Sequence, residues 1–150
     1  MASTRVFDTI TALLSMFDTA LTVPVRDGPY VVRGSDPLFV VVGHDGEPAS
    51  VDAASGSQSW ASIGAKARDE AGSITCVIVG QSGGSDLAEL RQTVEDTSTA
   101  VEAALRTDPT LGGVVQYAGF GTSFGLSQEA DPDQGLAVQL TFNVDYMARI

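Results

Sequence analysis

Residues 136–146 alternate between large apolar side chains and small or polar ones, and this pattern limits the possible folds more than any other. Because successive side chains of a β-strand point to opposite faces of a sheet, the pattern predicts a strand with one covered face. We expect residues 114–126 to pair with it as a long hairpin, joined by the polar segment 127–135. The large side chains are Leu136, Val138, Leu140, Phe142, Val144 and Tyr146.

Two segments have the helical spacing needed to cover that face. In residues 6–21 the apolar positions are 6, 10, 13, 14, 17 and 21, and Pro24 follows the expected end. Residues 86–106 have a similar stripe, and Asp86 followed by Glu89 resembles the start of a capping box. The segment 107–113 then prevents this helix from continuing, because it contains Pro109 and the pair Gly112-Gly113.

The remaining β-type segments lie between the two helices. They are residues 29–34, 38–47, 58–63 and 73–79, of which the last is continuously apolar, as is typical of a central strand. The expected order is α-β-β-β-β-α-β-β, which lacks a regular β-α alternation. This order indicates an α+β fold with two helices packed on a largely antiparallel or mixed sheet. Residues 1–150 are expected to form a single domain, with 46–59 as a possible mobile loop.

Charge and cysteine content narrow the possible partners and the compartment. Eight basic and nineteen acidic residues give a net charge of −11, which disfavours tight binding to a phosphate backbone. The single Cys76 excludes an intramolecular disulfide and favours a reducing compartment. No signal peptide or membrane span is expected, so we expect a soluble chain made in a cytoplasm, without membrane contact.

The sequence Gly80-Gln-Ser82-Gly-Gly84 matches the G-x-S-x-G pattern of a hydrolase nucleophile. The only histidine, His44, precedes the serine, whereas an α/β-hydrolase requires it afterwards. His44 lies beside the turn dipeptide Asp45-Gly46, where a solvent-exposed imidazole is expected. We favour a strand-to-helix corner, in which the glycines allow the turn and Ser82, Ser85 or Asp86 accepts N–H groups at the helix start.

The acidic clusters do not indicate a metal or acid–base site. Asp131 and Asp133 resemble the first half of a calcium loop, but the closing glutamate is replaced by Phe142, so a hairpin turn is favoured. Asp69-Glu70, next to Lys66 and Arg68, is expected to be a charged, solvated turn before the central strand. No cofactor, metal or catalytic residue is therefore expected, and we do not expect an enzyme.

Four segments in this order resemble one protein family. They are the helix at 6–21, the segment ARDEAGSITCVIVGQSG at 67–83, the helix end VEAALRTDPTLGG at 101–113, and the closing strand GLAVQLTFNVDYMARI at 135–150. This combination resembles the tail terminator (tail completion) proteins of long-tailed bacteriophages, in particular phages of actinobacteria. The resemblance covers roughly residues 3–150, and the helix end and closing strand are its most specific parts.

The resemblance implies a virion structural protein of the tail and neck, assembled in the host cytoplasm. Such a subunit forms a hexameric ring that caps the tail tube, ends its polymerisation and joins it to the head–tail connector. DNA would pass through only as cargo, which an acidic channel suits. Phe120, Phe124 and Leu126 fall on one face of the expected strand. We favour the core for them, with an assembly interface as the alternative.

Other functions are kept as alternatives. A head–tail connector, or neck, protein would share the small size and ring assembly. A small serine esterase using Ser82 and a small-molecule-binding α+β domain belong to different classes. Turnover of an activated ester that is lost in Ser82→Ala would indicate the esterase. A shift of the melting temperature on adding a ligand would indicate the binding domain.

Overall fold

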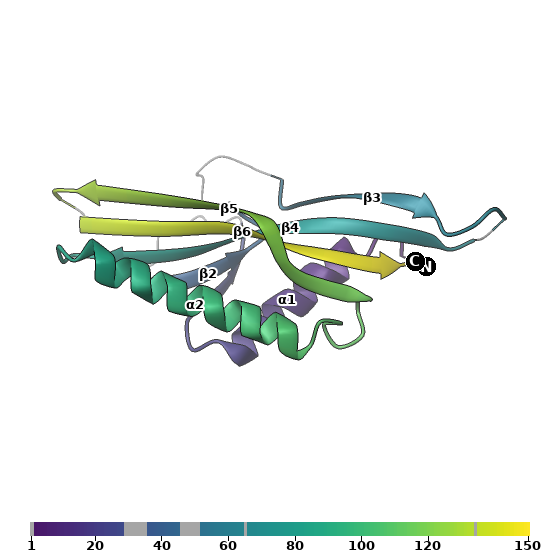
Figure 1. Cartoon of the computed structure of the whole chain (residues 1–150), viewed down its shortest axis with the longest axis horizontal. Coiled ribbons are helices and arrows are strands. Elements are labelled where there is room, and N and C mark those ends of the chain that lie inside the picture. The colour runs from purple at the N-terminus through teal and green to yellow at the C-terminus, as the bar shows by residue number, and fades with distance from the viewer. Residues whose placement is uncertain (1, 29–35, 46–51, 65, 134) are drawn as a thin grey trace.

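The computed structural model describes residues 2–28, 36–45, 52–64, 66–133 and 135–150, which form two helices and a six-stranded sheet (Figure 1). The predicted α+β class and the predicted order of elements are both confirmed. The predicted strand at 29–34 lies outside the described residues. The elements are α1 (Val6–Ala20), β1 (Val25–Asp27), β2 (Leu38–Val42), β3 (Ala54–Trp60), β4 (Arg68–Ser82), α2 (Leu87–Thr107), β5 (Tyr117–Asp131) and β6 (Gly135–Arg149).

Strand β4 organises the sheet. One of its edges pairs with β6 from Asp69↔Arg149 to Ser82↔Leu136, and its other edge is shared by β3 and β2. Strand β5 pairs with β6 as the predicted hairpin and forms one edge of the sheet. All pairings are antiparallel except that of β1 with β2, so the sheet is mixed. The continuously apolar run at 73–79 is central, as its composition predicts.

Both helices pack on one face of this sheet (Figure 1). The pairing register brings Ile74 opposite Val144 and Cys76 opposite Phe142, so their side chains share the helix-covered face. Burial of these apolar side chains together with the helix stripes supplies the main stabilisation of the fold. The core also contains Leu13 and Phe17 of α1, Val94, Val101 and Leu105 of α2, and Val138 of β6.

A smaller apolar cluster lies on the opposite face. Phe39 pairs with Val79 and Val41 with Val77, and all four side chains are buried. The β2–β4 half of the sheet therefore has apolar residues on both faces, which explains why its strands read as continuous apolar runs rather than alternating ones.

Strand β3 corrects the prediction of a loop at 46–59. Residues 46–51 lie outside the described residues, but 54–59 form most of β3, paired with β4 from Ala54↔Ile74 to Trp60↔Arg68. The strand predicted at 58–63 therefore begins at Ala54 and ends at Trp60. Because nearly all of β3 is exposed, its small residues carry no apolar periodicity that could have indicated a strand.

The β5–β6 connection is also shorter than predicted. Strand β5 continues to Asp131 and β6 begins at Gly135, so most of the polar segment 127–135 is strand. Residues 127–130 are exposed, and the apolar signal that marks a strand is consequently absent there.

Candidate assembly surfaces

The corner at 80–86 has the predicted structural role. Ser82 is the last residue of β4, and its Oγ accepts the backbone N–H of Gly84 at 3.1 Å. Asp86 is the N-cap of α2, and its Oδ1 accepts the N–H of Glu89 at 3.1 Å. Gly80 differs from the prediction because it lies inside β4 rather than in the turn. A Cβ there would come within 2.9 Å of Val94, so this glycine allows α2 to approach the sheet.

The structure does not bring His44 to Ser82. The backbone N–H of His44 donates to the carbonyl of Thr75 at 3.1 Å, seven residues from Ser82 along β4. Seven residues of strand span about 23 Å. The imidazole is also buried, with 7% of the residue exposed, which corrects the expectation of a solvent-exposed histidine. It is buried because the chain after Gly43 stays bonded to β4 instead of leaving the sheet.

Glu70 corrects a second expectation. Asp69 and Glu70 are part of β4 rather than of a turn, and Glu70 is 4% exposed. Its Oε1 accepts the Tyr146 hydroxyl at 2.7 Å and the backbone N–H of Arg5 at 3.0 Å, while Oε2 accepts the Gln58 side-chain amide. Only Asp69, which pairs with Arg149 at 2.7 Å, keeps the predicted solvated character.

These contacts fix the charge state of the buried carboxylate. Burial opposes its ionisation, but hydrogen bonds from Tyr146, Gln58, Thr4 and Arg5 together hold the pKa of Glu70 below its usual value. Burial, followed by the neighbouring Glu70, raises the pKa of Tyr146. Glu70 therefore stays ionised and Tyr146 neutral near neutral pH. The arrangement ties the start of α1 to three strands, a structural role, and it offers no group with a pKa near neutrality for proton transfer.

The three predicted interface residues are divided by a bulge in β5. Phe120 is half-buried and stacks on Phe142, with ring centroids 4.7 Å apart, so it belongs to the core as favoured. The register with β6 shifts between Phe120 and Phe124, and beyond it Phe124 is 75% and Leu126 53% exposed. The preference for the core is wrong for these two side chains, which lie beyond the bulge on an edge strand of the sheet and remain exposed.

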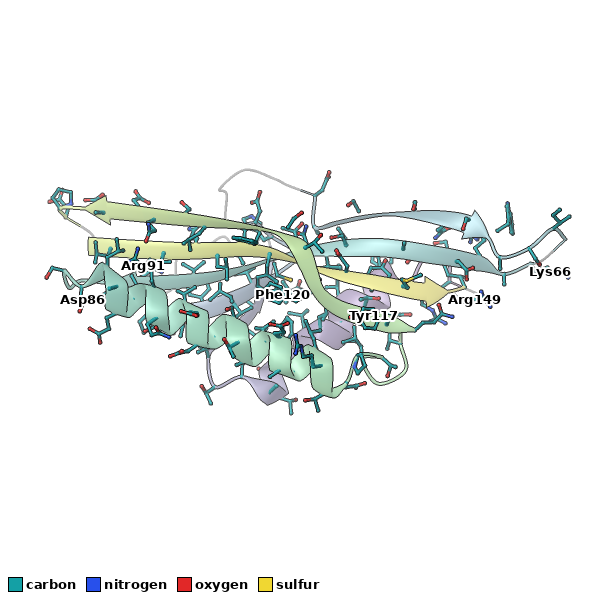
Figure 2. All side chains as sticks on the ribbon, in the orientation of Figure 1. Lys66, Asp86, Arg91, Tyr117, Phe120 and Arg149 are labelled. Carbon is teal, nitrogen blue, oxygen red and sulfur yellow. The ribbon has the colours of Figure 1, made fainter. Side chains whose placement is uncertain are left out.

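A second exposed apolar set lies at the opposite end of the sheet. Trp60 ends β3 with 67% exposure, and Ile63, in the connection to β4, is fully exposed. Together with Ser62 and Gly64 they line a shallow hollow of about 480 Å³. Figure 2 shows Lys66 at this extremity and Asp86 near the other. No sequence pattern indicated this set, because a single isoleucine in a short connection does not reveal whether it is covered.

A third pair lies on the sheet face that the helices leave open. Tyr117 and Met147 are opposite each other in β5 and β6 and are 57% and 54% exposed. With Ala71 and the serines at 55, 57 and 73 they line a shallow groove of about 450 Å³.

The part of the chain that the structure describes shows no chemistry-bearing cluster around these surfaces. Among the described residues, no group of three or more His, Cys, Asp or Glu side chains could hold a metal ion. No helix in the described ranges is both long and apolar enough to cross a membrane. The chain matches no protein-family model and no curated protein.

Proposed function

We propose that this chain is a structural ring subunit that caps the tail tube of a long-tailed bacteriophage. The observation that carries the proposal is the presence of separate exposed apolar sets on one long sheet, of which two lie far apart. Phe124 and Leu126 lie on β5, level with Cys76 and Ile78 of β4, whereas Trp60 and Ile63 lie at the end of the sheet where β4 begins. Contiguous exposed apolar side chains commonly mark association sites.

Two unlike surfaces suit a ring better than a two-fold dimer. A closed ring built from one kind of chain uses heterologous contacts, in which one patch of a subunit meets a different patch of its neighbour. A two-fold dimer would need only one self-complementary patch. The family resemblance adds the number of copies, six, and the partners: the tail tube protein on one side and the neck, or connector, on the other.

The charge of the chain is compatible with DNA passing through such a ring. With a net charge of −11, the subunit repels a phosphate backbone and would not retain it. A head–tail connector shares these properties. Finding the protein at the tube end of purified particles, rather than on the portal side, would distinguish the terminator from the connector.

The first test is the native mass across protein concentration, with and without magnesium. One chain has a mass of 15.5 kDa, so a hexamer should appear at about 93 kDa and form rings in negative stain. Phe124→Asp should fold normally but associate more weakly. Thr122→Asp, which places the same charge on an exposed polar position of the same strand, is the matched control. A chain that stays monomeric and does not bind isolated tube ends would overturn the proposal.

A further inference from the structure

The hairpin end of β3 and β4 is basic in an otherwise acidic chain. We define the β3–β4 tip as Trp60, Ile63, Lys66 and Arg68. Residues 60–68 contain two basic and no acidic side chains, although the whole chain carries a net charge of −11. Lys66 is exposed and makes no ion pair with the described residues. The Arg68 guanidinium lies 5.8 Å from the centre of the Trp60 ring and donates to Gln58.

The same tip exposes apolar surface that water solvates poorly. Trp60 is 67% exposed and Ile63 completely so, and the hollow between them is open to solvent. An apolar side chain from a partner would remove both from water, which favours association. The residue after Arg68, Asp69, is acidic but is paired with Arg149. The tip therefore combines exposed apolar surface with the two basic side chains Lys66 and Arg68.

The opposite end of the chain has the complementary properties. We define the β5–β6 tip as Leu126, Glu129 and Asp133. All three side chains are exposed, and the two carboxylates add to those of Asp86 and Glu89 at the start of α2 (Figure 2). One basic residue, Arg91, lies near this end, so the local charge remains negative.

We propose that the β3–β4 tip of one copy binds the β5–β6 tip of the next copy. This inference deepens the proposed ring, since it names the two patches that meet in each heterologous contact. The apolar side chain of Leu126 fills the hollow beside Trp60 and Ile63. Lys66 and Arg68 face Glu129 and Asp133, which fixes the direction of the contact and favours association between chains of equal net charge.

The two tips of one copy cannot meet. Leu126 pairs with Leu140, which pairs with Ile78, and Ile78 is ten strand residues from Arg68 at the other end of β4. Ten residues of strand span about 33 Å. Nucleic acid is a poorer occupant, because two basic side chains do not offset the charge of the remaining chain.

Charge reversal tests the pairing. At low salt, Lys66→Glu alone and Asp133→Lys alone should each lower the association constant at least about fivefold, because like charges then face each other. An equal mixture of the two variants, or both changes in one chain, should return to within about twofold of the parent. Arg106→Glu and Glu95→Lys, exposed positions of α2, are matched controls and should leave association unchanged. Single reversals that associate like the parent, or a mixture that does not recover, would overturn the inference.

Cysteine cross-linking provides a second readout that detects weak contacts. Ile63→Cys mixed with Leu126→Cys should give a heterodimer with a short bis-maleimide, whereas each variant alone should give little product. The native Cys76 is fully buried and burial raises its pKa to about 12, so it should stay unmodified. Homodimers of Ile63→Cys in place of heterodimers would indicate a two-fold contact and overturn the inference.

The outcomes separate this inference from the proposed function. If rings still form in the single-reversal variants, the proposed ring is supported and the tip-to-tip contact is contradicted. If charge complementation restores association but gives open chains and no closed species near 93 kDa, the contact is supported and the proposed ring is contradicted.

Discussion

The Tyr146 hydroxyl donates a 2.7 Å hydrogen bond to the Glu70 carboxylate, which also accepts the backbone N–H of Arg5 at the start of α1. Helix α1 has no capping hydrogen bond from its own N-cap side chain, so a residue 65 positions away supplies the acceptor. The Tyr146 ring lies over Gly72, where a Cβ would approach the ring within 2.4 Å. These contacts connect α1, β4 and β6 at one end of the sheet.

Tyr146→Phe and Glu70→Gln should each destabilise the fold by about 1–2 kcal/mol, because each leaves buried polar groups with fewer partners. The double variant should lose less than the sum of the two, with a coupling of about 1 kcal/mol. Urea unfolding of the four proteins measures this cycle. Additive losses would mean that the hydroxyl and the carboxylate do not interact in solution.

Acid should weaken the fold in part through Glu70. Its folded pKa is lowered from 4.5, so the unfolded chain binds the proton more readily and the contribution of Glu70 is present above pH 4.5. This stability is lost as the pH falls through the lower folded pKa. Unfolding free energies measured from pH 6 to pH 3 should therefore fall less steeply in Glu70→Gln than in the parent. Equal slopes would assign the acid sensitivity to other carboxylates.

Gly80→Ala should destabilise the chain by about 1–3 kcal/mol. Its Cβ would lie 2.9 Å from Val94 and 3.1 Å from Leu90, so α2 would have to move away from the sheet. Gly125→Ala, in β5, is the matched control because nothing lies within 4 Å of its Cβ. The control should change the melting temperature little. Equal effects of the two variants would indicate a general strand effect rather than close packing.

Phe120 and Phe124 should respond in opposite ways to truncation. Phe120→Ala removes the stacked contact with Phe142 and should cost about 2–4 kcal/mol of stability. Phe124→Ala should change stability by no more than about 0.5 kcal/mol, since that side chain is mostly exposed. Thermal melts measure both. A large loss for Phe124→Ala would show that its side chain is covered within the subunit.

The candidate surfaces were harder to predict than the fold. The alternating strand predicted that Phe120, Phe124 and Leu126 share one face, and pairing with β6 keeps them in phase. Which of them is buried depends on contacts with other strands, such as the stack of Phe120 on Phe142, and the sequence of β5 does not indicate those contacts. The exposure of Ile63 and Trp60 could not be predicted either, because a single apolar residue in a short connection does not reveal what covers it.

The two helices, the central strand and the terminal hairpin can be predicted from the sequence. These elements follow from local periodicity and from caps such as Asp86, which act over a few residues. Tertiary packing, by contrast, makes β3 a strand, buries Glu70 and His44, and leaves Phe124 exposed. Each of these depends on contacts between residues far apart in the chain, such as Ser57 with Ala71 or Glu70 with Tyr146. Burial of that kind is a property of packing, and no local pattern encodes it.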